Sequence, residues 1–267
     1  MAPMVSAGQD AGTGAGPPFE ALNAGGTAPL LLLCDHASQL IPSDLDSLGL
    51  DEAQLASHIA WDIGAAEVVR ELSRRLDAPA VLARYSRLLV DLNRHPDEAS
   101  LIPGEVDGIV VRGNVGLGPA EREQRVATYH QPYHQAVAEA VERLAVRGPG
   151  PAVVSIHSFT PVLGGVERPW EAGILSGRDQ RLSLPMLSFL RDLGLLVGDN
   201  EPYSGSDIYG YTVQQHARPR GLANVIVELR QDFVDTPHGV AEWVERLRRT
   251  LDATLDDPRV LERRVAA

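Results

Sequence analysis

Ala28–Cys34, which reads APLLLLC, is a continuous apolar run, and the polar residues of Asp35–Ser38 (DHAS) follow it at once. Because the run lacks the alternation of a strand with one solvated face, it predicts a strand buried on both faces. Three further strands, mostly apolar, are expected at Ala152–Ile156, Ala172–Leu175 and Val225–Leu229. Strands of this type are typical of parallel sheets whose two faces are covered by helices.

Amphipathic segments alternate with these runs and have the spacing of helices that pack on a sheet. The expected helices are Glu52–Leu76, Pro119–Val146 with a kink at Pro132, Gln180–Leu193 and Pro237–Leu255. Shorter strands are expected at Pro79–Ala83, Leu88–Leu92 and Leu195–Val197, and an irregular loop at His95–Pro119. The alternation predicts a single α/β domain at residues 28–267, with a mostly parallel or mixed central sheet flanked by helices. Residues 1–27, rich in Ala, Gly and Pro, are predicted to be a flexible leader.

The composition excludes several kinds of partner and chemistry. A formal net charge of −12 disfavours nucleic acid and anionic membrane surfaces and favours a small-molecule substrate. The chain contains no lysine, which excludes Schiff-base chemistry and a P-loop lysine, so a cation that binds an anionic substrate must be arginine or a metal. The single cysteine, Cys34, excludes an internal disulfide and fits a reducing cytoplasm. No segment approaches the ~18 apolar residues of a membrane span.

Two histidines follow buried strands, His36 after Ala28–Cys34 and His157 after Ala152–Ile156. Ligands of open α/β sheets bind beyond the carboxyl ends of the strands, where these two side chains would meet. Two histidines and one carboxylate are the usual protein ligands of a hydrolytic zinc ion, with one position left for water. The alternative is that each histidine only bonds to loop backbone. We therefore take a metal site at His36 and His157 as a hypothesis.

The carboxylate ligand of such a site has two candidates, Asp62 and Asp35. His58 and Asp62 are four residues apart within an expected helix, so they share a face and could present a ligand pair or form a simple hydrogen bond. Asp35 directly precedes His36. Asp62 is preferred, and Asp35 remains its rival.

The segment 86–94, SRLLVDLNR, carries candidate substrate-binding residues. Arg87, Asp91 and Asn93 lie on one face of the expected strand, and Arg94 ends it. A buried arginine needs a carboxylate partner or an anionic ligand. For Arg87 the alternative to substrate binding is a structural ion pair, whereas Arg94 beside Asn93 is suited to a bidentate grip on a substrate carboxylate. Arg112 is a further candidate for that grip.

Glu228 lies near the end of the apolar strand Val225–Leu229. Partial burial there would raise its pKa toward the range useful for proton transfer, and a salt bridge is the alternative. Tyr203, in a turn-rich segment, and Ser158, next to His157, are candidate substrate contacts. Cys34 shares a strand face with His36, but the apolar run before it predicts a buried, inert thiol.

Six blocks of the sequence, in this order, resemble those of the N-formylglutamate amidohydrolase family. They are CDHAS at 34–38, HIAWDIGA at 58–65, SRLLVDLNR at 86–94, IHSFTP at 156–161, NEPYSG at 200–205 and VELRQD at 227–232. The resemblance spans residues 28 to 255 and implies a zinc-peptidase-like α/β fold related to that of zinc carboxypeptidases. By position, it implies that His36 and His157 are metal ligands, Asn93 and Arg94 bind a carboxylate, and Glu228 is the general base.

One position departs from the related carboxypeptidases, which place a glutamate three residues after the first histidine. This chain has Gln39 there. Because Asp62 lies in a block that shares the family pattern, it is proposed as the third ligand. That assignment leaves Asp35 as the alternative.

The function that this resemblance implies is zinc-dependent hydrolysis of N-formyl-L-glutamate to glutamate and formate in histidine degradation. The expected location is the cytoplasm. One divalent metal, zinc, is the expected cofactor, and a small anionic molecule is the expected partner, with no nucleic acid or membrane. The alternatives are a zinc hydrolase of another N-acyl amino acid or a small peptide, and a ligand-binding relative without catalysis. The expected catalytic residues are Glu228 and Arg94, and the expected substrate contacts are Arg94, Asn93, Arg87, Tyr203 and Ser158. The oligomeric state is not predicted.

Overall fold

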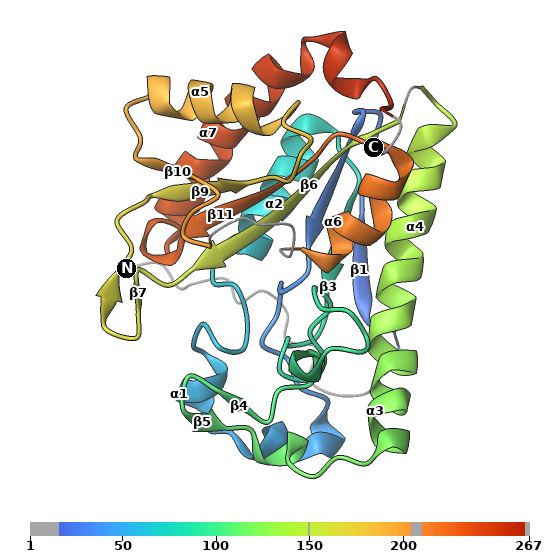
Figure 1. Cartoon of the computed structure of the whole chain (residues 1–267), viewed down its shortest axis with the longest axis vertical. Coiled ribbons are helices and arrows are strands. Elements are labelled where there is room, and N and C mark those ends of the chain that lie inside the picture. The colour runs from blue at the N-terminus through green and yellow to red at the C-terminus, as the bar shows by residue number, and fades with distance from the viewer. Residues whose placement is uncertain (1–15, 149, 204–209, 265–267) are drawn as a thin grey trace, which may run out of the picture.

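A computed structural model of the chain describes residues 16–148, 150–203 and 210–264. Its centre is a seven-stranded sheet with the strand order β1-β3-β2-β6-β11-β9-β10 (Figure 1). The strands are β1 (Phe19–Leu22), β2 (Leu30–Cys34), β3 (Ala80–Ala83), β6 (Ala152–Phe159), β9 (Ala172–Leu175), β10 (Val197–Asp199) and β11 (Asn224–Arg230).

The sheet is mixed. Strands β3, β2, β6 and β11 are parallel to one another, β9 and β10 are antiparallel to β11, and β1 is antiparallel to β3. The mixed sheet flanked by helices confirms the predicted fold class. Every residue of β2, β3, β6 and β9 is buried, and for β2 the continuous apolar run predicts this.

Helices cover both faces of the sheet (Figure 1). On one face, α2 (Ala65–Leu76) packs on β2, β3 and β6, while α5 (Ser183–Asp192) packs on β9 and β10. The long helix α7 (Pro237–Leu255) contacts both α2 and α5. On the other face, α4 (Gln131–Ala145) contacts β1, β2 and β3, and α6 (Tyr211–His216) contacts β11.

A smaller region lies beyond the carboxyl ends of β2 and β3, at the bottom of Figure 1. It contains α1 (Glu52–Leu55), the hairpin of β4 (Glu105–Val106) and β5 (Ile109–Val110), and several short 3-10 turns. It has its own apolar cluster, formed by Leu48, Leu50, Ile59, Ala60, Leu88 and Val111. This cluster anchors the irregular segments that supply part of the site.

The predicted helix Glu52–Leu76 is wrong in its middle, because α1 ends at Leu55 and α2 begins only at Ala65. Gly64 lies between them with a φ of +79°, and a β-carbon there would lie 2.2 Å from the carbonyl oxygen of Val234. A helix cannot continue through this left-handed residue. Residues 56–64 therefore form a loop, and its backbone is joined to the end of β2 by the bond from the Asp62 amide to the His36 carbonyl, 2.9 Å.

The predicted strand Leu88–Leu92 is also wrong. The segment is buried but folds into turns, with its amide and carbonyl groups bonded to nearby loops. Val90 and Leu92 belong to the main hydrophobic core, and Leu88 belongs to the cluster of the smaller region. A short apolar run fits either a strand or a buried turn, and here tertiary contacts decide.

The predicted leader, residues 1–27, is too long at its C-terminal end, because Phe19–Leu22 forms β1 and pairs with β3. Residues 1–15 lie outside the described residues.

The predicted helix Pro119–Val146 consists of α3 (Pro119–Arg125), a π-helical turn at Val126–His130, and α4, so the irregularity precedes Pro132. The remaining short elements are β7 (Val162–Leu163), β8 (Val166–Glu167) and 3-10 turns at Ser43–Gly49, Ala99–Leu101, Arg112–Asn114, Arg218–Arg220, Gln231–Phe233 and Pro258–Leu261. In the described part of the chain, no helix has the length and apolar character needed to cross a membrane.

Candidate active site

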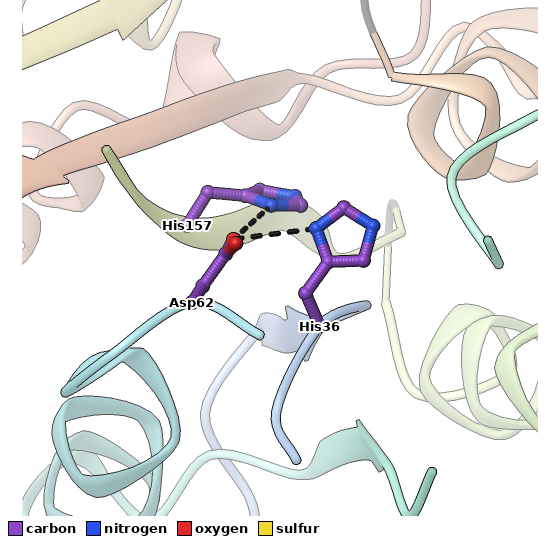
Figure 2. A group of neighbouring side chains, drawn as sticks. All are labelled: His36, Asp62 and His157. Carbon is purple, nitrogen blue, oxygen red and sulfur yellow. Dashed lines mark hydrogen bonds and ion pairs between the residues drawn. The ribbon is translucent and has the colours of Figure 1, made fainter. Parts of the chain in front are cut away.

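His36, Asp62 and His157 meet at the carboxyl edge of the parallel strands (Figure 2). The Asp62 Oδ2 atom lies 3.3 Å from His36 Nδ1 and 2.8 Å from His157 Nδ1. All three side chains are buried, and one potential ligand atom from each lies within 4.8 Å of the other two. The group could therefore hold a metal ion, with two imidazole nitrogens and one carboxylate.

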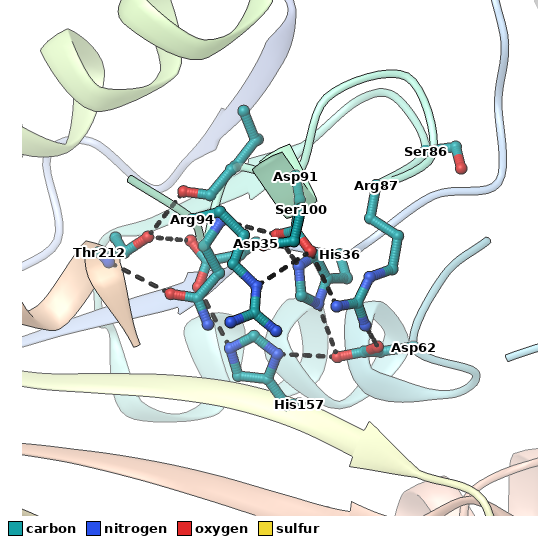
Figure 3. A network of polar contacts seen from close by, with 12 residues as sticks. Asp35, His36, Asp62, Ser86, Arg87, Asp91, Arg94, Ser100, His157 and Thr212 are labelled. Carbon is teal, nitrogen blue, oxygen red and sulfur yellow. Dashed lines mark hydrogen bonds and ion pairs between the residues drawn. The ribbon is translucent and has the colours of Figure 1, made fainter. Parts of the chain in front are cut away.

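The Nε2 atom of each histidine, which points away from Asp62, is held by a different carboxylate (Figure 3). His36 Nε2 lies 2.7 Å from Asp91 Oδ1, and His157 Nε2 lies 3.2 Å from Asp35 Oδ2. Histidines that bind metals usually have such a partner, which fixes the ring orientation and makes the inner nitrogen more basic. Both Nδ1 atoms therefore face the same point, where Asp62 also lies.

Asp35, the rival ligand in the sequence, lies behind His157 rather than between the histidines. Its Oδ1 accepts hydrogen bonds from the Tyr133 hydroxyl at 2.8 Å and the Thr212 hydroxyl at 2.7 Å. Its Oδ2 faces His157 and the Ser155 hydroxyl. Because its oxygen atoms already accept these hydrogen bonds, Asp35 is placed to orient His157. Asp62, which lies between the two histidine Nδ1 atoms, is the better candidate for the carboxylate ligand.

The pairing of charges also favours a cation at this point. Burial alone would lower the pKa of His157, but its hydrogen bonds with Asp35 and Asp62 outweigh burial and raise that pKa well above the ordinary value. Burial would raise the pKa of Asp62, but the two histidines hold it well below its usual range. The carboxylates thus stabilise positive charge beside the histidines, as a divalent cation requires.

Glu228 is adjacent to His157 through the parallel pairing of β11 and β6. It is 7% exposed, and its Oε2 has no hydrogen-bond partner among the described residues. Burial raises the pKa of Glu228 to about 7, against the opposing charge of His157. A buried carboxyl with an unpaired oxygen and a pKa near neutrality is suited to accept and release a proton.

These groups line a cavity of about 100 Å³. The lining residues are His36, Asp62, Arg87, Asp91, Asn93, Arg94, His157, Ser158, Leu175, Tyr203, Gly210, Ile226 and Glu228. The predicted site residues are thus brought together, although they come from six separate segments of the chain. Arg112 is not among the lining residues and lies exposed in the smaller region.

The two arginines of the cavity differ in how firmly they are held. Arg87 donates to Asp91 Oδ2 at 2.8 Å and lies 3.7 Å from Asp62 Oδ1, and these carboxylates raise its pKa in spite of burial. Among the described residues, the carboxylates near Arg94 lie farther away, 4.0 Å for Asp91 and 3.8 Å for Glu98. Arg94 is therefore the cation with more freedom to bind an anion in the cavity.

Three other predicted residues have structural contacts. Asn93 Oδ1 accepts from the Thr212 amide at 3.2 Å, which fixes its side chain next to Arg94. The Ser158 hydroxyl donates to the Ile63 carbonyl at 2.8 Å and so holds the loop that carries Asp62. His58 is wrong as a partner of Asp62, because it pairs instead with Asp107 at 2.9 Å in the smaller region.

A family model described as N-formylglutamate amidohydrolase matches residues 28–234. The chain belongs to the N-formylglutamate amidohydrolase family. Curated relatives named N-formylglutamate deformylase, from Pseudomonas aeruginosa and Pseudomonas putida, are 27% and 29% identical over 129 residues. These matches cover 45% of this chain and 47% of each relative, so the chain spans about half the length of the curated relatives it matches.

Solved structures extend the similarity to nearly the whole chain. The gene product Atu2144 from Agrobacterium tumefaciens is 37% identical, with a TM-score of 0.88 over 91% of this chain and 97% of that one. N-formylglutamate amidohydrolase from Ralstonia eutropha is 21% identical, with a TM-score of 0.68 over 91% of this chain and 98% of that one. The second likeness bears on the fold alone.

For this member of the N-formylglutamate amidohydrolase family, sequence reasoning missed mainly the residues that support the site. The sequence pattern places Asp91 on one face with Arg87 but gives no sign of its contact with His36, and it does not identify Thr212 or Tyr133. Ile226 could have been found, because it lies two residues before Glu228 on β11 and so shares its face. The other pairings depend on contacts between distant segments and leave no local signal.

Proposed function

We propose that this chain is a metal-dependent amidohydrolase that cleaves the amide bond of a small N-acyl amino acid, with N-formyl-L-glutamate as the first candidate. Zinc is the proposed metal, and His36, Asp62 and His157 are its proposed ligands. The observation that carries the proposal is the convergence of two histidine Nδ1 atoms on one carboxylate, beside the unpaired Oε2 of Glu228.

The donor set fits a divalent metal. Two imidazoles and one carboxylate match the ligands of hydrolytic zinc sites, and each imidazole has a carboxylate partner on its Nε2 atom, as such sites usually contain. When bound, zinc would polarise the scissile carbonyl and make a water molecule more acidic.

Glu228 would move the proton. With its pKa near 7, the carboxylate is present at neutral pH and can accept a proton from the attacking water at Oε2. The same carboxyl can then donate this proton to the nitrogen of the leaving amine, since a group with a pKa close to the working pH serves as base and acid in turn.

Arg94 and Asn93 would bind a carboxylate of the substrate. Arg94 offers a guanidinium whose own carboxylate contacts are long, and a planar guanidinium can bind a carboxylate with two hydrogen bonds. Asn93 is held next to it by Thr212. Arg87, Tyr203 and Ser158 are further proposed contacts, because they line the same cavity. Fixing the substrate in this way aligns its amide with the proton-transfer group.

The proposed setting is histidine degradation in the cytoplasm. The one cysteine, Cys34, is buried and free, which fits a reducing compartment. The names of the curated relatives support the formylated amino acid as substrate.

The test is formate release from N-formyl-L-glutamate by the purified protein, with N-acetyl and peptidyl glutamate and aspartate compared in parallel. The proposal expects formyl glutamate to be the preferred substrate and Glu228→Gln to lower kcat by about 10²–10⁴-fold. If glutamate were released from the acetyl or peptidyl compounds but not from the formyl compound, the assignment as an amidohydrolase would stand and the assigned substrate would change. Binding without hydrolysis of any compound would contradict the proposal.

A further inference from the structure

Arg168 lies next to the cavity in an unusual setting for a buried cation. It is 8% exposed, and its guanidinium carbon lies 5.1 Å from the centre of the Phe159 ring and 5.6 Å from that of Tyr203. Its Nε donates to the Thr160 carbonyl at 2.8 Å, and its Nη1 lies 3.4 Å from the Tyr203 hydroxyl. Two aromatic rings thus pack against the guanidinium.

No described carboxylate lies within ion-pair distance of Arg168, and no described residue accepts a hydrogen bond from its Nη2. The two other buried arginines are satisfied. Arg181 pairs with Asp179, and Arg125 donates to two backbone carbonyls and the Asn114 side chain. Burial of a charge is costly unless it is paired, so the guanidinium of Arg168 has capacity for an anion.

The position of Arg168 connects it to the proposed active site. Phe159, on which it stacks, lies two residues beyond His157 on β6, so the two side chains share a face about 7 Å apart along the strand. Tyr203, its other neighbour, lines the cavity together with Glu228. An anion bound to Arg168 would therefore lie at the edge of the cavity, beside Tyr203.

The two arginines that line the cavity, Arg87 and Arg94, can together bind only one carboxylate of a substrate. Arg87 is paired with Asp91 and lies near Asp62, so its charge is already balanced. Arg94 can bind one carboxylate, but an N-acyl dicarboxylic amino acid carries two. The α-carboxylate and the side-chain carboxylate then need separate cations, and Arg168 is the buried cation next to the cavity without a carboxylate partner among the described residues.

We infer that Arg168 is a specificity-determining residue, which binds the side-chain carboxylate of an N-acyl dicarboxylic amino acid. This inference rests on the proposed function, since it names the part of the substrate that the enzyme recognises. It predicts a strong preference for glutamate over glutamine, which has the same shape but no side-chain charge.

The experiment is a comparison of two substrates in four proteins. kcat/KM is measured for N-formyl-L-glutamate and N-formyl-L-glutamine with wild type, Arg168→Gln, Arg168→Lys and the control Arg246→Gln. Arg246 also stacks on an aromatic ring, that of Trp243, but lies on α7 and pairs with Glu242. Arg168→Gln should lower kcat/KM for formyl glutamate by about 10–100-fold and leave formyl glutamine within about 3-fold, because one charged hydrogen bond is lost. Arg168→Lys should lie between, and the control should match wild type.

Equal losses for both substrates would mean that Arg168 only holds the loop, and would overturn the inference. An unchanged preference in Arg168→Gln would also overturn it. A second readout does not depend on turnover: calorimetric affinity for L-glutamate and L-glutamine in the same proteins. If wild type released no formate, the proposed function would fail. In that case, tighter binding of glutamate than of glutamine that is lost in Arg168→Gln would still support the inferred role of Arg168. Equal binding of the two amino acids by wild type would refute that role.

Discussion

Asp91 connects the two halves of the proposed chemistry. One of its oxygens lies 2.7 Å from His36 Nε2, and the other accepts from Arg87 at 2.8 Å. Asp91 therefore both orients His36, a proposed metal ligand, and neutralises the charge of Arg87 in the cavity. A change at this carboxylate should affect metal binding even though Asp91 is not itself a proposed ligand.

Replacement of Asp91 by Asn keeps the size of the side chain and removes its charge. We expect Asp91→Asn to weaken zinc affinity by about 10–100-fold, because the imidazole of His36 loses its anionic partner. Competition with a chelating dye measures this change. The matched control is Asp107→Asn, which removes the carboxylate partner of His58 outside the cavity. Equal zinc affinity in Asp91→Asn and wild type would contradict the proposed support role.

His134 and His216 form a buried neutral pair behind the site. Their rings stack, and His134 Nδ1 lies 2.9 Å from His216 Nε2. Burial lowers the pKa of His134 to about 3, with a further contribution from His130, and lowers that of His216 to about 4, with a contribution from Arg220. Both values lie below 6.5, the ordinary value for histidine.

This pair predicts a loss of stability in acid. Between pH 6.5 and about 4 the unfolded chain takes up protons at these two histidines that the folded chain does not, so the contribution of the pair to the free energy of unfolding falls as the pH falls. The slope is about 1.4 kcal/mol per pH unit for each such histidine. His216→Gln should reduce this slope in urea unfolding followed from pH 7 to pH 5, whereas His238→Gln, at an exposed position of α7, should not. An unchanged slope in His216→Gln would refute the assignment.

The segment Asn200–Tyr203 reaches the cavity only because strands β9 and β10 carry glycines. A β-carbon at Gly173 of β9 would lie 1.9 Å from the carbonyl oxygen of Glu201, and one at Gly198 of β10 would lie 2.6 Å from the Glu201 β-carbon. Since Gly173 also pairs with Glu228 across the sheet, the close approach places Tyr203 beside Glu228. This is a case in which glycine is required for backbone contact rather than for its dihedral angles.

Gly173→Ala should displace that segment and with it Tyr203. We expect kcat/KM to fall by up to about 100-fold, because small displacements in a site that orients its substrate have large effects on rate. Zinc content should stay unchanged, since the proposed ligands come from other elements. Gly25→Ala is the control, because nothing lies within 4 Å of a β-carbon at this exposed glycine. Full activity of Gly173→Ala would show that the segment has no part in the reaction.

Elements with a strong local pattern could be predicted from the sequence. β9 and α7 lie where the hydrophobic pattern placed them, and β2, β6 and β11 differ only at their ends. The failures are segments whose conformation is set by distant partners. The loop 56–64 exists because Gly64 packs against the backbone of Val234, and β1 exists because β3 offers it a free edge. Neither partner is visible in a local window of sequence.

In the site as well, local sequence patterns predicted some residues, whereas contacts between distant segments could not be predicted. The topology places the ends of β2 and β6 side by side, so that His36 and His157 meet although 121 positions separate them. Strand-end position and residue type were enough to propose the histidines and Glu228. They could not reveal that Asp35 and Asp91 hold the outer nitrogens, because this depends on the directions of buried side chains.

The proposal that this molecule holds a catalytic metal is tested most directly by zinc content of the purified protein, measured together with formate release. We predict about one zinc per chain in wild type, in the control His58→Ala and in Glu228→Gln, and loss of the metal in His157→Ala. Glu228→Gln should keep its zinc and lose turnover. An active wild-type enzyme without bound metal, or a His157→Ala variant that binds zinc as wild type does, would contradict the account.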